Sequence, residues 1–198
     1  MPQFMRDNSQ NDGHAETVMD YVISWCLRRA DVICKDEKPI LYSHCRFMLG
    51  KLLGIKNTDD VIFSNVKVRK QDQHIDLWVE LTKACQGEIT KHALLIENKY
   101  YTGLHDTTDI DGKRRNQLEV YKKRFEAHYA DKPNEDWDLH YALITCLERE
   151  SDSKFEQYRI AEKFGFNLFS FYDLLKNDIQ TESDLFNEFW YRWGDPRF

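Results

Sequence analysis

The sequence lacks any long apolar run. No stretch of its 198 residues approaches the ~18 consecutive apolar residues of a membrane span. Residues 1–7 also lack the apolar segment of a signal peptide. We therefore expect a cytoplasmic protein with no membrane partner.

Cysteine is sparse and poorly placed for cross-linking. The five cysteines are an odd number, widely spaced and without a Cys-x-x-Cys pair, which argues against a disulfide framework and a zinc ribbon. The seven histidines include no His-Glu-x-x-His. Repeats, low-complexity tracts and linkers are absent, so we expect one domain over residues 14–198, preceded by a flexible, polar segment over 1–13.

The composition that remains is that of a globular chain. Hydrophobic residues make up 41% and aromatic residues 14%, enough for one α/β domain with a sizeable core. The net charge of −6 disfavours a nucleic-acid binder. From Lys91 to Arg124, however, eight basic residues stand against five acids. That stretch fits a polyanionic substrate or a solvated helix, and both readings stay open.

Periodicity places the secondary structure along the chain. Strand, helix and strand follow one another over 92–147, which indicates a right-handed crossover and a parallel strand pair. The expected elements are helices at 14–30, 40–53, 113–129, 153–164, 172–179 and 183–193, and strands at 60–69, 73–81, 92–98, 138–147 and 166–169.

The two strands at 73–81 and 92–98 are expected to form a hairpin with polar side chains at its open end. The connection contains Gln86-Gly87, and a turn centred there places Asp76 directly opposite Glu97. Lys99 lies two residues further and points to the same face. A register slip of one residue would separate the three side chains.

Two carboxylates and one ammonium group in this arrangement fit metal-assisted hydrolysis. Magnesium prefers oxygen ligands and keeps several waters, so two carboxylates leave room for water and a phosphate oxygen. A neighbouring lysine can orient the attacking water or neutralise developing charge. The alternative is an ordinary strand face with a Glu–Lys cross-pair.

At these residues the sequence resembles the PD-(D/E)xK nuclease superfamily. Leu95-Ile96-Glu97-Asn98-Lys99 resembles the "IENK" form of one branch, and Gln117-Leu118-Glu119-Val120-Tyr121 resembles the Gln-x-x-x-Tyr motif of RecB-like members. The resemblance covers residues 60–147. His74-Ile75-Asp76 stands where the superfamily name promises Pro-Asp.

The resemblance implies a restriction-endonuclease-like core, in which a mixed β-sheet with an antiparallel hairpin and a parallel crossover strand is flanked by helices. It implies a nuclease dependent on Mg²⁺ or Mn²⁺, with DNA as the substrate. Asp76 and Glu97 would bind the metal, Lys99 would position water, and Gln117 and Tyr121 would orient the substrate. Some RecB-like nucleases hold an iron–sulfur cluster, but the cysteine triplet this requires near the C-terminus is missing, so we expect no cluster.

Further residues are candidates for the same site. The resemblance implies an acid of the first helix near the metal, and Glu16, in the first turn of that helix, is the candidate for this third acid. The alternative is an acid favoured by the helix dipole. We expect Tyr100 to stack on a base or to pack at the strand end. Lys113, Arg114 and Arg115 are expected on the basic face that binds nucleic acid.

Two further possibilities concern partners. The apolar stripe of the last helix, which includes Phe186, Phe189, Trp190 and Trp193, suits the core or the surface of a homodimer. A catalytically inactive protein of the same fold that binds nucleic acid or a protein partner is the alternative to the nuclease.

Overall fold

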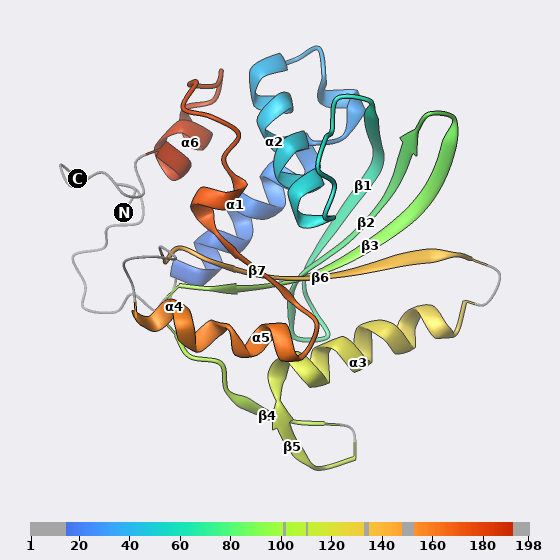
Figure 1. Cartoon of the computed structure of the whole chain (residues 1–198), viewed down its shortest axis with the longest axis vertical. Coiled ribbons are helices and arrows are strands. Elements are labelled where there is room, and N and C mark those ends of the chain that lie inside the picture. The colour runs from blue at the N-terminus through green and yellow to red at the C-terminus, as the bar shows by residue number, and fades with distance from the viewer. Residues whose placement is uncertain (1–14, 101, 110, 133–134, 148–152, 192–198) are drawn as a thin grey trace.

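The computed structural model describes residues 15–100, 102–109, 111–132, 135–147 and 153–191. A five-stranded sheet runs through the molecule, and helices cover both of its faces (Figure 1). The predicted flexible segment over 1–13 lies outside the described residues. None of the helices in the described ranges is both long and apolar enough to cross a membrane.

The sheet is mixed and has the order β1-β2-β3-β6-β7. Three antiparallel strands come first, and β6 and β7 then run parallel to β3. This architecture confirms the predicted α/β fold class with an antiparallel hairpin and a parallel crossover strand. The strands are β1 (Val61–Asp72), β2 (Ile75–Cys85), β3 (Glu88–Lys99), β6 (Trp137–Thr145) and β7 (Asn167–Ser170).

The β2–β3 turn sets the register of the central hairpin. Gln86 and Gly87 have φ values of 50° and 86°, and two successive positive φ values are typical of the turns that join two-residue hairpins. Pairing runs from Cys85 opposite Glu88 to Leu77 opposite Ile96. This is the register expected from the sequence.

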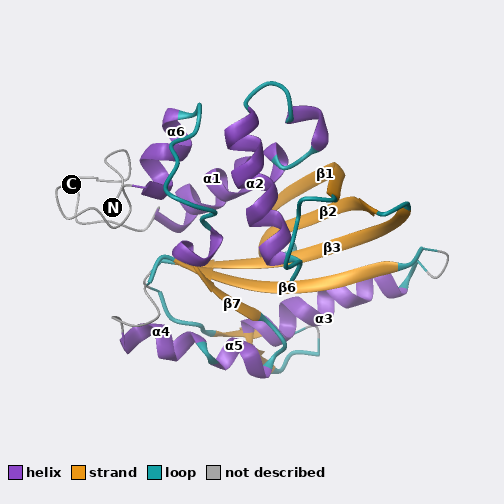
Figure 2. Ribbon diagram, turned by 45° about the horizontal axis from the view of Figure 1, so that its top comes forward, coloured by secondary structure: helices purple, strands orange, loops and turns teal. Residues whose placement is uncertain are grey.

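The helices are divided between the two faces of the sheet (Figure 2). One face carries α1, the 3₁₀ turn η2, α2 and the C-terminal elements; the other carries α3, α4 and α5. The bounds are α1 (Ala15–Arg29), η2 (Val32–Cys34), α2 (Pro39–Leu52), α3 (Gln117–Ala130), α4 (Ser153–Tyr158), α5 (Ile160–Lys163), η3 (Phe171–Leu174), α6 (Asp184–Phe186) and the π-helical turn η4 (Asn187–Tyr191).

Alternation along β2 gives each face its own core. Leu77 and Val79 are buried on the face that carries α1. Trp78 points to the face that carries α3, and its ring centroid lies 4.7 Å from that of Phe125. The indole N–H of Trp78 donates to the hydroxyl of Tyr129 at 2.8 Å, which satisfies the polar atom of a buried side chain.

The outer edge of β1 is covered by one side chain from the last turn of α1 and one from the turn that follows it. Arg28 donates to the carbonyl oxygen of Val68 at 2.8 Å, and Oδ2 of Asp31 accepts from the backbone N–H of Val66 at 2.9 Å. Backbone groups at a sheet edge otherwise remain available for another strand.

The last helix predicted from sequence consists of α6 and η4. Phe186, Phe189 and Trp190 are buried, so they belong to the core. Trp193 lies outside the described residues.

Three predicted helices were wrong in part. The helix expected from residue 113 begins at Gln117, because Arg114–Asn116 forms β5 and pairs with β4 (Asp106–Thr108). The side chain of Asn116 caps α3 by accepting from the N–H of Leu118 at 3.0 Å. The helix predicted over 153–164 is divided into α4 and α5, and that over 172–179 is only the 3₁₀ turn η3.

Candidate active site

The predicted trio converges where β2 begins and β3 ends. Continuing the hairpin register by one residue beyond Leu77 and Ile96 places Asp76 opposite Glu97. The ammonium nitrogen of Lys99 lies 2.8 Å from Oε1 of Glu97. Both side chains are buried, and Glu97 is only 2% exposed.

Gln117 completes the surroundings of Glu97 from the first turn of α3. The side-chain Nε2 of Gln117 donates to Oε1 of Glu97. The side-chain Oε1 of Gln117 accepts from the backbone N–H of His105 at 3.2 Å. The second bond fixes which end of the amide faces Glu97. Tyr121 lies one turn later and is also buried. Burial, followed by the charges of Glu97 and Asp76, raises the pKa of its hydroxyl.

Asp76 is oriented by two donors. Its Oδ2 accepts from the backbone N–H of Asn98 at 2.9 Å, and its Oδ1 accepts from the side-chain amide of Gln71 at 3.0 Å. Gln71 has a φ of 53°, an uncommon backbone conformation for a residue with a side chain. Each carboxylate oxygen keeps a further lone pair for another partner.

Asp20, on α1, is a member of the site that the sequence reasoning missed. It is 4% exposed and accepts from the side-chain amides of Asn98 at 2.7 Å and Gln71 at 3.1 Å. Burial and the neighbouring charge of Asp76 raise its pKa to about 6. Glu16 and Asp20 are four residues apart on one helix face, and such a like-charged pair is unfavourable by itself. That spacing was the available signal.

Glu16 lies at the same end of the sheet, beside the chain that leaves β3. Its carboxylate accepts from the backbone N–H of Tyr100 at 2.9 Å and from the hydroxyl of Thr102. Its charge contributes to the raised pKa values of Asp76 and Glu97, after the larger effects of burial. The structure therefore brings both acids of α1 to the site.

The electrostatics of the cluster favour a cation. Burial, then the charge of Asp76, raises the pKa of Glu97 to about 8, although Lys99 acts in the opposite direction. Oε2 of Glu97 is buried without a hydrogen-bond partner in the described residues. A buried oxygen without a partner is costly, and a divalent cation would satisfy it and lower the repulsion between the carboxylates.

The donors present fit a hard cation that keeps much of its hydration. Asp76 and Glu97 supply carboxylate oxygens from adjacent strands, which is the type of ligand that magnesium accepts. In the described part of the chain, no group of three or more His, Cys, Asp or Glu side chains is arranged as a ready-made metal site. The arrangement is thus an open pair of oxygen ligands with a lysine beside it.

The residues predicted to contact nucleic acid lie in two places, with Tyr100 next to Lys99 and the other three on the β4–β5 hairpin. Tyr100 is 7% exposed, so its ring is packed at the strand end and does not present a face for stacking. Lys113 and Arg114 are exposed on the β4–β5 hairpin, not on a helix. Arg115 forms ion pairs with Asp109 at 2.5 Å and Asp111 at 2.7 Å, both in the loop of that hairpin.

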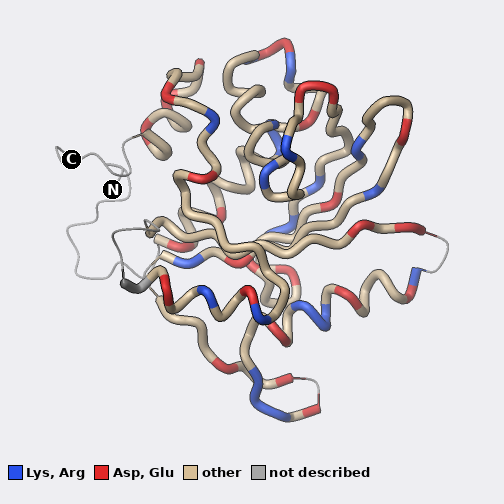
Figure 3. The backbone as a smooth tube through the Cα atoms, viewed as in Figure 1, with Lys and Arg blue, Asp and Glu red and all other residues tan. Residues whose placement is uncertain are grey.

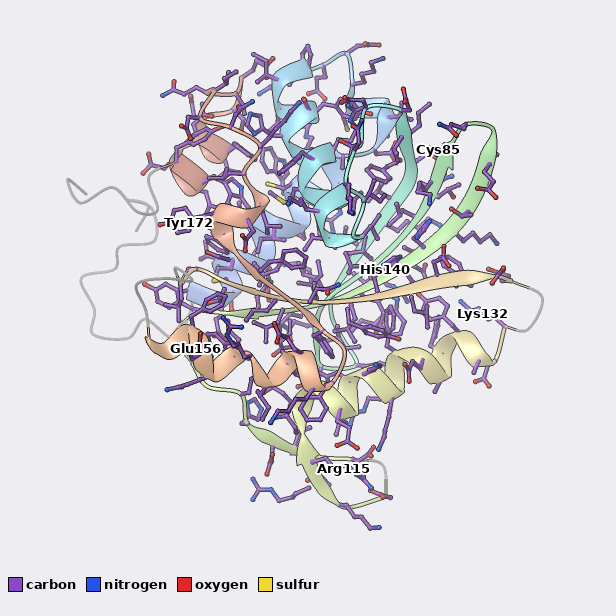
Figure 4. The ribbon with its side chains drawn as sticks, viewed as in Figure 1. Cys85, Arg115, Lys132, His140, Glu156 and Tyr172 are labelled. Carbon is purple, nitrogen blue, oxygen red and sulfur yellow. The ribbon has the colours of Figure 1, made fainter. Side chains whose placement is uncertain are left out.

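Charge on this side of the molecule is mixed. Figure 3 shows acidic and basic residues interleaved along α3 and the β4–β5 hairpin. Figure 4 labels Arg115 on the hairpin, which extends away from the sheet. Acidic and basic residues therefore alternate along this part of the backbone.

Comparisons with family models, with curated proteins and with solved structures find no match to this chain.

Proposed function

We propose that this chain is a metal-dependent nuclease that hydrolyses phosphodiester bonds with Mg²⁺ or Mn²⁺. The observation that carries the proposal is the opposition of Asp76 and Glu97 across the β2–β3 hairpin, with Lys99 2.8 Å from Glu97 and one Glu97 oxygen buried without a partner. The resemblance of these residues to the PD-(D/E)xK pattern supports the same activity. DNA as the substrate rests on that resemblance alone.

Asp76 and Glu97 would hold the metal, and Asp20 is the third carboxylate within the same hydrogen-bonded network. When bound, a divalent cation offsets negative charge on the phosphoryl group and makes nearby water more acidic. Asn98 and Gln71 orient Asp76, and Gln117 orients Glu97, before any substrate arrives. Such fixed donors reduce the reorganisation that the reaction requires.

Lys99 is proposed to position the attacking water and to stabilise the negative charge that develops on the phosphoryl group. Its pKa is raised, because the attraction of Glu97 and the other acids outweighs the effect of burial, so the side chain stays charged. A charged ammonium group beside the carboxylates can donate to the attacking water or to a phosphoryl oxygen as negative charge develops. Tyr121 borders the same space from α3.

A calorimetric titration of magnesium and manganese tests the proposal, combined with cleavage assays on single- and double-stranded DNA and on RNA. Wild-type protein is expected to bind metal and to cleave, and Glu97→Gln is expected to do neither. Wild-type protein that binds nucleic acid but cleaves neither DNA nor RNA in either metal would contradict the nuclease and favour a binding protein.

A further inference from the structure

We propose that Tyr21 and Lys70 form a stacking position for one unpaired base beside the scissile phosphate, so that the substrate is a single-stranded or frayed nucleic acid. The proposal rests on the nuclease function above and specifies its substrate class. The two residues come from α1 and β1, and they lie together although 49 positions separate them.

Tyr21 directly follows Asp20 on α1. Successive helical residues point about 100° apart, so Asp20 faces Asn98 and Gln71 while Tyr21 turns outward. Tyr21 is 60% exposed, whereas its neighbour Asp20 is 4% exposed. The ring therefore lies at the rim of the site and not in the core.

Lys70 is in β1, next in sequence to a member of the same network. It immediately precedes Gln71, whose amide joins Asp20 to Asp76. The ammonium nitrogen of Lys70 lies over the ring of Tyr21, and its charge lowers the pKa of Asp20, although burial has the larger and opposite effect. Among the described residues, no acidic side chain forms an ion pair with Lys70, whereas Arg115 and Lys123 are both paired with acids.

An exposed aromatic ring, with an ammonium group that has no ion-pair partner among the described residues, suits a single nucleotide. The ring provides a stacking surface for a base, and the flexible lysine can leave the ring and neutralise the adjoining phosphate. Bases inside a duplex are already stacked on both sides, so only an unpaired, terminal or flipped base can reach Tyr21. The stacking position therefore takes a base from a single strand or from a frayed end.

The test compares Tyr21→Ala, Tyr21→Phe and Lys70→Ala on a labelled single-stranded oligonucleotide and on the same sequence as a blunt duplex. Cleavage is measured in magnesium and binding by anisotropy in calcium. Tyr21→Ala is expected to raise KM for the single strand about tenfold, in line with the loss of one stacked base, with little change in kcat. Tyr21→Phe keeps the ring and is expected to resemble wild type.

Lys70→Ala is expected to raise KM and to flatten the dependence of binding on salt, because one phosphate contact is lost. Lys67→Ala is the matched control. Lys67 is exposed on the same strand and stands opposite Glu80 in the register of β1 and β2, and its side chain lies on the other face of the sheet from that of Lys70. It is expected to leave the preference for single strands unchanged.

The outcomes separate this inference from the proposed function. If wild type cleaves but Tyr21→Ala retains its single-strand KM, or if wild type prefers the duplex, the stacking position is wrong and the nuclease stands. If nothing is cleaved, yet Tyr21→Ala weakens single-strand binding, the stacking position stands and the nuclease is wrong. If wild type neither binds nor cleaves the single strand, both are wrong.

Discussion

The side-chain amide of Asn98 donates to Oδ1 of Asp20 at 2.7 Å, and this bond joins the strand that carries Glu97 and Lys99 to the first helix. Asn98 is the unspecified residue of the Glu-x-Lys pattern. Its backbone N–H orients Asp76 on one side, and its side chain holds Asp20 on the other. One residue therefore positions two acids of the site.

Asn98→Ala is expected to lower the free energy of unfolding by about 1–3 kcal/mol, because buried Asp20 loses a donor. Urea unfolding of Asn98→Ala, Asp20→Ala and the double variant measures the coupling. The double variant should cost less than the two single variants together. Strict additivity would mean that the bond between the two side chains contributes nothing.

Glu97→Gln is expected to abolish metal binding and to lower the cleavage rate at least 10²-fold, as for removal of one group that stabilises a transition state. The fold should be retained, since the amide keeps the shape of the side chain. Calorimetry and a cleavage assay make the measurement. Glu88→Gln, at the far end of the same strand, is the matched control. Metal-dependent cleavage by Glu97→Gln at the wild-type rate would contradict the site.

Lys99→Met is expected to lower kcat by about 10²–10³-fold while metal binding persists, because the lysine is assigned to water and charge and not to the metal. The methionine keeps an unbranched side chain in a buried position. Lys91→Met on the same strand serves as control, since Lys91 is exposed and paired with Glu135. A wild-type kcat for Lys99→Met would remove its assigned role.

Without divalent metal, stability is expected to fall as pH rises from about 4.5 to about 8. Folded Glu97 keeps a proton up to a pKa of about 8, whereas the unfolded chain releases it near 4.5. Unfolding therefore releases a proton in that window, at about 1.4 kcal/mol for each unit by which the two pKa values differ. Asp20, with a pKa of about 6, acts in the same direction.

Chemical unfolding across this range in EDTA, for wild type and Glu97→Gln, measures the effect. Glu97→Gln should show a flatter dependence on pH. Magnesium competes with the proton, so its addition should stabilise wild type more at pH 8 than at pH 5. Equal stabilisation at both pH values would argue against metal binding by these carboxylates.

The sequence predicted the hairpin register because one local feature determined it. A two-residue turn at Gln86-Gly87 leaves no freedom in the pairing that follows, so the opposition of Asp76 and Glu97 could be deduced. Asp20 was missed for the opposite reason. Its partners, Gln71 and Asn98, are 51 and 78 residues away, and only the tertiary packing of α1 on the sheet brings them together.

The basic residues before α3 are a second place where the sequence pattern predicted the wrong element. Lys113, Arg114 and Arg115 continue the spacing of a helix, and nothing local distinguishes them from Lys122 and Lys123. In the structure Arg114–Asn116 pairs with β4, and Arg115 is held by the acids of its own loop. A count of charges along the chain does not reveal such pairing.

Arg28 and Asp31 occupy backbone groups on the outer side of β1 that a neighbouring chain would need. A second molecule cannot extend the sheet there unless it first displaces both side chains. Strand-to-strand aggregation at this edge of the sheet is therefore opposed.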